Sequence, residues 1–432
     1  VTVPSNLEIG LKEWSPQNIS IKTNPEAIIW AVDGVDDNSV AFAARLMEKG
    51  VEVRIIDKEA LLSKQSLSRG SIAVLAMDNP EYEDLSETVN SIASDLDISV
   101  LSIESGFGAE ELPDWGGRHF RLLERPQIAI LSQSGFSSYD VGVSWWSLDH
   151  HLGIRHSQID ASLVNYADLR RYNTIILPSG YRDMGEYEKK VLSDWMEQGG
   201  TLIAHAASSS ALASEQGIGS VKLLQNTFEE SEKYNISLQR ELSALYEELD
   251  IESVNSNKVD LDTAYPWEQS EGKYPPSQLE YRDNWQSIFM PSGAFVSGRT
   301  DQEHWLTFGT NSTLPLLYRS YPVLMSDDSS EAPIRVGVFS DSAKANTYST
   351  INWSDIPPGK ELNVRMSGLL WPEAAQRIAN SAYLTRDRIG KGQLILFSGE
   401  PNFRGATLGT NRVWLNAVVY GAGLGTEPRI TP

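Results

Sequence analysis

Short apolar runs alternate with amphipathic segments along most of this chain, and this alternation limits its possible folds more than any other feature. The first runs are Ala27–Val32, Val51–Ile56, Ser71–Met77 and Ile98–Ile103. Between them, Asp36–Lys49 and Pro80–Leu96 have the spacing of amphipathic helices. Strands that alternate with helices predict a mainly parallel sheet that is covered on both faces. We therefore expect a small, doubly wound α/β unit over residues 25–117, after a polar lead-in segment at residues 1–24.

The alternation begins again at about residue 124. Strands and helices are predicted in turn at Gln127–Leu131, Val141–Leu152, Thr174–Leu177, Glu186–Gln198 and Thr201–His205. Regularity is then lost in an insertion at about residues 221–290, in which Ile236–Ile251 has helical spacing and residues 256–290 read as a long loop. After it, strands are predicted at Gly293–Ser297, Trp305–Phe308, Ile334–Phe339 and Gln393–Phe397, and helices at Pro372–Ser381 and Asn411–Tyr420. Residues 124–425 are therefore predicted to form a second doubly wound, mainly parallel α/β unit.

The composition excludes several classes of function. The 432 residues carry a formal net charge of −22, and such a surface repels phosphate backbones, so we expect no nucleic-acid partner. The absence of cysteine excludes disulfides, thiolate metal sites and cysteine nucleophiles. No apolar run reaches the roughly 18 residues that a membrane span needs, so no membrane span is expected.

The histidines do not have the spacing of a common zinc site. They are His119, His150, His151, His156, His205 and His304. None is followed three residues later by a glutamate, and no H-E-x-x-H occurs. Asp149 and the histidines at 150, 151 and 156 form the only acid and histidine cluster, but adjacent residues of a helix point in different directions. We therefore predict neither a metal site nor a cofactor.

One order of elements is informative about chemistry. A strand ending in Pro178-Ser179-Gly180 is followed by a helix and then by Thr201–Ala213, where a strand runs directly into a helix. This order resembles the core of class I glutamine amidotransferase-like domains. In that family the first turn supplies an oxyanion-hole amide, the strand-to-helix turn carries a nucleophilic cysteine, and a histidine near the end of the last strand completes the pair. The resemblance places Ala206 at the nucleophile position, and no histidine follows His304. Because alanine cannot attack a carbonyl, the resemblance implies a degenerate, non-catalytic member.

A serine nucleophile is an alternative interpretation of the same turn. Ser208, Ser209 and Ser210 follow it closely, and His205 directly precedes it. A Ser/His hydrolase needs its base within hydrogen-bond reach and usually a G-x-S-x-G turn, which this chain lacks. Serines in the first turn of a helix also commonly cap it. A hydrolase with an unrecognised Ser/His site therefore stays open beside the non-catalytic reading.

A set of short motifs in the last part of the chain carries a second resemblance. They are Ser367–Glu373, Ala382–Thr385, Gly390–Phe397, Pro401–Gly405, Gly409–Arg412 and Leu415–Ala417. They resemble the C-terminal region of large bacterial zinc-carboxypeptidase-like proteins, in which a zinc-binding catalytic domain precedes an amidotransferase-like region. The resemblance covers roughly residues 25–425 and implies a non-catalytic accessory region. It also implies a carboxypeptidase catalytic domain of the same polypeptide as a partner, and a secreted or periplasmic location.

Open α/β sheets form crevices at the carboxyl ends of their strands, and this predicts where a ligand would bind. The residues expected there are Ser179, Gly180, His205, Ser208, Glu400, Phe403 and Arg404. An arginine at such a place favours a carboxylate, as a peptide end would supply. Alternatively, tryptophans could stack on sugars in a carbohydrate- or peptidoglycan-binding module. The candidates are Trp145, Trp146, Trp267, Trp285, Trp305 and Trp353.

Overall fold

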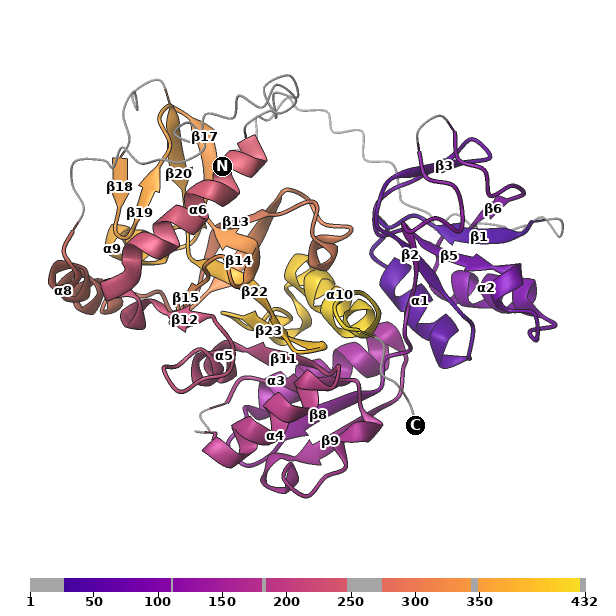
Figure 1. The fold of residues 1–432 in the computed structure, drawn as a ribbon, viewed down its shortest axis with the longest axis horizontal. Helices are drawn as coiled ribbons and strands as arrows, with labels where there is room; N and C mark the ends of the chain where they lie inside the picture. The colour runs from indigo at the N-terminus through magenta and orange to yellow at the C-terminus, as the bar shows by residue number, and fades with distance from the viewer. Residues whose placement is uncertain (1–26, 110–111, 181–183, 247–273, 343–348, 428–432) are drawn as a thin grey trace, which may run out of the picture.

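The chain folds into a smaller and a larger sheet-containing unit that share one hydrophobic core (Figure 1). This computed structural model describes residues 27–109, 112–180, 184–246, 274–342 and 349–427. In Figure 1 the smaller unit, in indigo and purple, lies at the right, and the larger one, in magenta to yellow, lies at the left. The protein therefore belongs to the α/β class, as predicted.

The smaller unit is built on a five-stranded sheet in the order β6-β1-β5-β2-β7. Its strands are β1 (Ile29–Val32), β2 (Arg54–Ile56), β5 (Ile72–Leu75), β6 (Leu101–Ile103) and β7 (Phe120–Leu122). All neighbouring pairs are antiparallel, so the predicted parallel, doubly wound arrangement of residues 25–117 is wrong. Helix α1 (Ser39–Glu48) joins β1 to β2, which run in the same direction, but β5 lies between them and runs the opposite way. The alternation of strands and helices in the sequence does not reveal such interleaving.

The two faces of the smaller sheet are covered differently, because alternate residues of a strand point to opposite faces. On one face, Trp30 belongs to the shared core together with α1 and α2 (Leu85–Asp95). On the other face, Ile29 packs against a hairpin of β3 (Ala60–Leu62) and β4 (Gln65–Leu67). Helices therefore cover one face only, and a hairpin that the sequence pattern did not predict covers the other.

The larger unit contains a mixed sheet of 12 strands. One half is parallel, in the order β9-β8-β10-β11-β23. Its strands are β8 (Ile128–Ser132), β9 (His156–Asp160), β10 (Thr174–Leu177), β11 (Thr201–His205) and β23 (Gly392–Phe397). The other half is antiparallel, and it consists of β13 (Ala294–Thr300), β14 (Thr313–Tyr318), β16 (Glu331–Val336) and β22 (Ala382–Ile389), with β12 (Lys222–Leu223), β15 (Leu324–Met325) and β21 (Arg365–Ser367) at its sides. The prediction of a mainly parallel sheet is therefore wrong for this second half.

The sheet changes from parallel to antiparallel at a two-residue turn, Gly390-Lys391, between β22 and β23. Gly390 has φ +57°, a conformation that glycine adopts without steric cost. The sequence pattern predicted only the strand that follows this turn. It missed β22 because that strand carries Arg386, Asp387 and Arg388, and such a charged run is untypical of a buried strand.

Helices cover both faces of the parallel half. On one face lie α3 (Ser138–Trp146) and α10 (Leu408–Leu424), whose Trp414 is fully buried in the shared core. On the other face lie α4 (Glu186–Glu197) and α5 (Ala206–Leu212), which pack in a second core. The broad apolar face predicted for the last helix is therefore part of the core, and α10 is buried along nearly its whole length.

Two long helices lie in the described part of the segment predicted as an irregular insertion, residues 221–290. They are α6 (Ser231–Tyr246) and α8 (Pro276–Ser287). The helix predicted at Ile236–Ile251 overlaps α6, and its last residues lie outside the described residues, as does the first part of the predicted loop. The loop prediction is wrong where α8 forms. Leu279 is the one buried apolar residue of α8, so its sequence shows no helical period.

Helix α9 (Pro372–Ile378) and two small two-stranded sheets complete the larger unit near α6 and α8 (Figure 1). One sheet pairs β17 (Val338–Asp341) with β20 (Lys360–Asn363), and the other is a hairpin of β18 (Ser349–Ile351) and β19 (Ser354–Ile356), which lie between them in the sequence. The predicted strand Trp305–Phe308 is instead a 3₁₀ turn over its first three residues. Other short helical turns lie at Ala76–Asp78, Ser147–Leu152, Ala161–Leu163, Leu169–Arg171, Leu224–Asn226, Phe228–Glu230 and Phe403–Gly405. Of the helices in the described ranges, none has the length and apolar character that a membrane crossing needs.

Arg412 of α10 connects the two units. Its guanidinium donates hydrogen bonds to the carbonyl oxygens of Gly34 and Asp36, each at 2.7 Å, and to Ser39 Oγ at 3.1 Å. The arginine side chain is only 3% exposed. Because these three acceptors lie in the turn between β1 and α1 and at the start of α1, we infer that Arg412 holds the smaller unit against α10.

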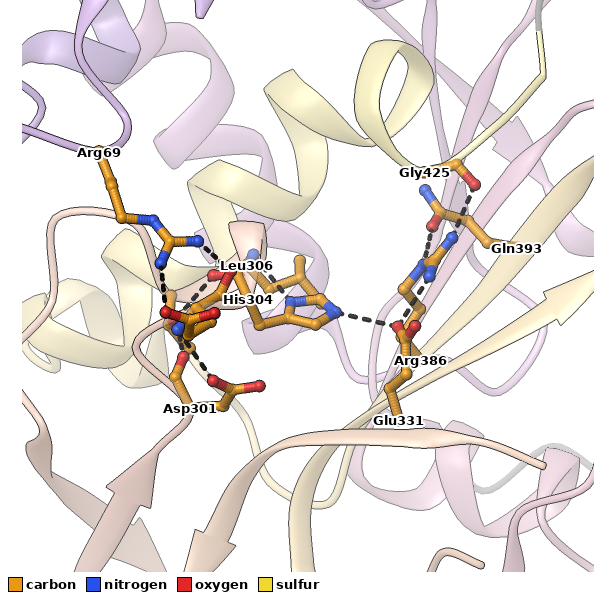
Figure 2. Close-up of polar contacts among 10 residues, drawn as sticks. Arg69, Asp301, His304, Leu306, Glu331, Arg386, Gln393 and Gly425 are labelled. Carbon is orange, nitrogen blue, oxygen red and sulfur yellow. Dashed lines mark hydrogen bonds and ion pairs between the residues drawn. The ribbon is translucent and has the colours of Figure 1, made fainter. Parts of the chain in front are cut away.

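Figure 2 shows a second set of polar contacts, around His304, Glu331 and Arg386. Arg69 of the smaller unit reaches across to Glu303, with 3.3 Å between the nitrogen and the carboxylate oxygen. In the larger unit, His304 Nε2 lies 3.0 Å from Glu331 Oε2. Arg386 Nη1 lies 2.7 Å from the same oxygen. Glu331 therefore accepts two charge-assisted contacts from different strands and loops.

We expect Glu331 to make the stability of the protein depend on pH in the acid range. Burial raises the pKa of this carboxyl, but hydrogen bonds from His304 and Arg386 outweigh burial and lower the pKa from 4.5 to about 2. A lowered pKa in the folded state means that the stabilisation is complete above pH 4.5 and is lost as the pH falls toward 2. Because the side chain is 52% exposed, screening reduces its expected contribution to about 1–2 kcal/mol.

Urea unfolding at about pH 3 and about pH 7 measures this effect. The variant Glu331→Gln should be less stable than the native protein at neutral pH, and the difference should shrink at acid pH. Glu427→Gln is the matched control, because Glu427 pairs with the exposed Arg388 and should change little. An equal loss from Glu331→Gln at both pH values would contradict the lowered pKa.

Candidate functional site

A cleft of about 820 Å³ lies at the carboxyl ends of the parallel strands. Ser179 and Gly180 follow β10, Ala206 and Ala207 follow β11, and Glu400 follows β23; all five line the cleft. Neighbouring parallel strands end at the same edge of a sheet, which is why residues more than 200 positions apart meet here. Of the residues predicted for the crevice, Ser179, Gly180 and Glu400 therefore line one cleft, together with Ala206.

Ala206 is the first residue of α5 and has a positive φ of +43°. Such a conformation costs an alanine roughly 1–2 kcal/mol, so the surrounding structure has to hold it. The residue is 2% exposed and directly follows the buried strand β11. In α/β-hydrolases, a strained turn between a strand and a helix exposes the nucleophilic side chain. Here the turn presents a methyl group, which has no nucleophilic atom.

A buried acid–histidine pair lies next to this turn. Asp140, near the start of α3, accepts a hydrogen bond from the backbone N–H of Ser179 and lies 3.0 Å from His205 Nδ1. The imidazole is fully buried, with its ring close to Phe397 and Trp414. Its Nε2 atom has no hydrogen-bond partner within the described part of the chain. His205 does not line the cleft; with Asp140 it supports the cleft wall from the core side.

The serines of α5 are mostly engaged with main-chain carbonyl groups. Ser208 Oγ donates to the carbonyl oxygen of Pro178 at 2.6 Å, and Ser209 Oγ donates to that of Phe397 at 2.7 Å. These bonds tie α5 to the ends of β10 and β23. Ser210 lines the cleft, but in the described residues no hydrogen bond joins it to a histidine. A hydrolytic role for these serines would need a base that this geometry does not supply.

The opposite wall of the cleft comes from residues that the sequence analysis did not identify. Arg319 and Tyr321 follow β14, and Arg377 belongs to α9; all three line the cleft. Asp283 of α8 accepts two hydrogen bonds from Arg377, at 2.7 and 3.3 Å, so this arginine is committed to a buried ion pair. Arg319 is exposed and has no carboxylate partner at ion-pair distance in the described ranges. No sequence signal connects these residues with the strands on the other wall.

Phe403 and Arg404 lie beside the cleft and do not line it. The guanidinium carbons of Arg319 and Arg404 lie 5.5 and 5.2 Å from the centre of the Phe403 ring, distances that suit cation–π attraction. Phe403 therefore contacts one arginine that lines the cleft and one that does not. Arg404 has φ +51°, a second strained non-glycine residue near this edge of the sheet.

Glu400 is the acidic residue that lines the cleft. Burial raises the pKa of its carboxyl, and the nearby charge of Asp140 raises it further, while Arg319, His205 and Arg404 act in the opposite direction. A carboxyl with a raised pKa in a cleft loses its negative charge at a higher pH than an exposed glutamate. The charge of this wall therefore depends on pH.

The only acid and histidine cluster of the sequence forms a helix end packed on an aromatic ring. His150 and His151 lie beside Trp146, with ring centres 5.6 and 4.4 Å apart from it. Burial and the neighbouring His150 lower the pKa of His151. Among the residues that the structure describes, no three His, Asp or Glu side chains gather in a way that could hold a metal ion.

The tryptophans considered for sugar binding are spread over the molecule. Trp353 is buried, Trp146 and Trp305 are half-buried, and Trp267 lies outside the described residues. Trp145 and Trp285 are exposed. Trp285 belongs to an aromatic strip that the sequence analysis missed, because Phe289 lies between it and the exposed Trp371, with ring-centre distances of 5.2 and 6.5 Å. The predicted platform therefore does not form as one surface.

Comparison with known proteins leaves the family open. No family model and no curated protein matches the chain. A ThuA-like protein from Bacteroides uniformis ATCC 8492 is 12% identical over 71% of this chain and 95% of its own, with a TM-score of 0.32. A ThuA-like protein from Parabacteroides merdae ATCC 43184 is 11% identical over 72% and 94%, with a TM-score of 0.33. A beta-galactosidase from Bacillus circulans sp. alkalophilus is 12% identical over 84% and 38%, also with a TM-score of 0.33. Scores this low assign neither a family nor a function.

Proposed function

We propose that this chain is a non-catalytic binding region with a class I glutamine amidotransferase-like fold, acting as the accessory region of a zinc-carboxypeptidase-like protein. The observation that carries the proposal is the strained strand-to-helix turn at the cleft, which presents Ala206 where a nucleophile would stand. The strand order β9-β8-β10-β11-β23 supports it, because the chain visits this half of the sheet in a doubly wound order, 2-1-3-4-5. The partner in this proposal is a carboxypeptidase catalytic domain of the same polypeptide, in a secreted or periplasmic protein.

The charges of the cleft favour a ligand that carries a carboxylate, such as the C-terminal end of a peptide. Arg319 is the exposed cation of the lining, and a guanidinium pairs well with a carboxylate through two parallel hydrogen bonds. Glu400 would repel such a ligand when it is ionised. Binding should therefore strengthen as the pH falls through the raised pKa of Glu400.

The test is a titration with an acetylated tripeptide that ends in a free carboxylate, compared with the same peptide as its C-terminal amide. The free acid should bind more tightly, and Arg319→Gln should weaken its binding roughly tenfold or more. Arg388→Gln is the matched control, because Arg388 is an exposed arginine that pairs with Glu427 and does not line the cleft. Equal affinity for acid and amide, or an equal loss in both variants, would contradict a carboxylate site.

The absence of catalysis in this proposal is tested separately. The purified chain should not release C-terminal residues from peptides, and it should hold no stoichiometric zinc by elemental analysis. Hydrolysis that a chelator abolishes would refute a non-catalytic role. Hydrolysis that persists in the chelator would instead favour the Ser/His alternative, and Ser210→Ala would then identify the serine that lines the cleft.

A carbohydrate-binding role is a second candidate, and the aromatic strip of Trp285, Phe289 and Trp371 favours it. Exposed tryptophan rings in a row offer the flat apolar surface on which sugar rings stack. Tryptophan fluorescence during titration with chitin oligosaccharides separates this role from peptide binding. A change that Trp371→Ala removes would support it.

A further inference from the structure

A second large pocket, of about 940 Å³, lies at the opposite edge of the parallel half of the sheet. Gln127 and Ile128 bring the start of β8 to it, His156 brings the start of β9, and Tyr172 precedes β10. Parallel strands begin as well as end together, so this pocket is the counterpart of the first cleft at the amino ends of the same strands. Asp149 and His156 of the acid and histidine cluster line this pocket, but the proposed function does not involve it.

Three arginines line this pocket. Arg125 precedes β8, Arg155 precedes β9, and Arg171 lies at the end of the turn before β10. They come from three separate segments, and the order of the strands places all three together. Asp149 is the one acidic residue of the lining.

Glu48 of α1 holds two of these arginines in place. One of its oxygens accepts a hydrogen bond from Arg125 Nη2 at 3.1 Å, and the other accepts one from Arg155 Nε. A guanidinium has several further N–H donors, so this bridge orients both arginines without using up their hydrogen-bonding capacity. Glu48 itself is mostly buried and does not line the pocket.

Arg171 is exposed and makes no ion pair within the described ranges, in contrast to its neighbour Arg170, which is paired with Asp168 at 2.8 Å. The lining of the pocket contains three arginines and a single acidic residue, Asp149, while Glu48 contacts two of the arginines from outside the lining. The whole chain carries a formal net charge of −22. A positive pocket on so acidic a protein attracts anions locally while the rest of the surface repels them.

We propose that this pocket binds the phosphate group of a small phosphorylated ligand. Arginine forks match the tetrahedral oxygens of a phosphate through paired, charge-assisted hydrogen bonds. Ile128, Ile154 and Tyr172 add apolar and aromatic lining that can contact the organic part of the ligand. Arg171 supplies a guanidinium that forms no ion pair among the described residues, and Arg155 supplies a second, pre-oriented donor group. The site is independent of the cleft at Ala206.

The test is calorimetric titration of the full chain at low ionic strength with glucose 6-phosphate, inorganic phosphate and glucose. Glucose 6-phosphate should bind with a dissociation constant in the millimolar range or lower, inorganic phosphate more weakly, and glucose not measurably. Arg171→Gln should weaken the binding of glucose 6-phosphate roughly tenfold. Arg155→Gln should weaken it as well. Added salt should weaken it further, because the pocket is open to solvent.

Arg170→Gln is the matched control, since it removes an adjacent arginine of the same turn that does not line the pocket. It should leave the affinity unchanged. Because Arg171 makes no ion pair in the described structure, its replacement should not disturb folding, and circular dichroism checks this for each variant. Absence of binding of either phosphate compound at 20 mM, or equal losses in the Arg170 and Arg171 variants, would overturn the proposal. Tighter binding of a dicarboxylate such as succinate would also overturn it.

Discussion

Arg412→Met is expected to lower the free energy of unfolding by about 3–5 kcal/mol. The replacement keeps a long apolar side chain but removes every hydrogen bond from α10 to the turn before α1. The buried carbonyl oxygen of Gly34 and the buried hydroxyl of Ser39 would then lose this donor, whereas the partly buried carbonyl oxygen of Asp36 would keep its hydrogen bond from the backbone N–H of Ser39. Each unsatisfied buried polar group costs about 1–3 kcal/mol of the free energy of unfolding. The expected loss for Arg412→Met is therefore larger than the loss from an ordinary surface replacement.

Urea unfolding with two probes measures this loss and shows where it acts. Tryptophan fluorescence reports on both units, and limited proteolysis with mass spectrometry locates the first cleavages. The native protein should unfold as one cooperative body because a single core spans both units. In Arg412→Met, cleavage should begin in the smaller unit before the larger unit opens. The control Arg388→Met removes an exposed pair with Glu427 and should cost below about 1 kcal/mol. If Arg412→Met lowered the free energy of unfolding no more than the control Arg388→Met does, the packing of α10 alone would hold the two units together.

Arg412 also gives a physical role to one of the motifs that carry the resemblance to zinc-carboxypeptidase-like proteins. The residue types of Gly409–Arg412 do not by themselves indicate such a role. In the structure Arg412 reaches the smaller unit, and Asn416, one turn later, donates to the carbonyl oxygens of Leu306 and Phe308. A sequence displays the helical period of α10 but does not say which distant turn each polar residue on it will meet.

Four of the five strands in the parallel half of the larger sheet were predictable because local signals and tertiary structure agree there, whereas the mostly polar strand β9 was not predicted. Strands β10, β11 and β23 are short, fully buried apolar runs, and the helices between them have clear apolar stripes. These elements alone place Pro178–Gly180 and Ala206 at one edge of the sheet. The positive φ of Ala206 was not predictable from its residue type, since alanine seldom adopts that conformation.

The antiparallel half and the second wall of the cleft were not predictable in this way. Asp387 of β22 is buried and accepts hydrogen bonds from Ser220, and Arg386 of the same strand pairs with Glu331. Partners from distant segments thus stabilise a charged strand that its own sequence does not suggest. Arg319 reaches the cleft only because β14 continues the sheet far from the strands that carry Ala206. Such placements depend on long-range pairing, which leaves no local period.

Asp140→Ala is the second replacement for which we expect a large effect, a loss of about 3–5 kcal/mol in the free energy of unfolding. Asp140 is 4% exposed, and its carboxylate accepts hydrogen bonds from the backbone of Ser179 and from His205. Without it, a buried N–H and a buried imidazole nitrogen both lose their partner. Asp194→Ala is the control, because Asp194 forms an exposed pair with Lys190 on α4 and should cost below about 1 kcal/mol.

The same replacement tests whether the acid–histidine pair supports the cleft. Ser179, Gly180 and Glu400 line the cleft, whereas Asp140 does not, so an effect of Asp140→Ala on ligand binding acts through the turn after β10 or through Glu400, whose pKa the charge of Asp140 raises. Asp140→Asn removes the negative charge and keeps the acceptor, since Ser179 and His205 both contact the same oxygen, Asp140 Oδ2, and the amide oxygen of an asparagine can take its place. We expect Asp140→Asn to recover part of the stability and most of the affinity for the free-acid tripeptide. If both variants lost stability but bound the tripeptide as tightly as the native protein, the pair would stabilise the fold without shaping the cleft.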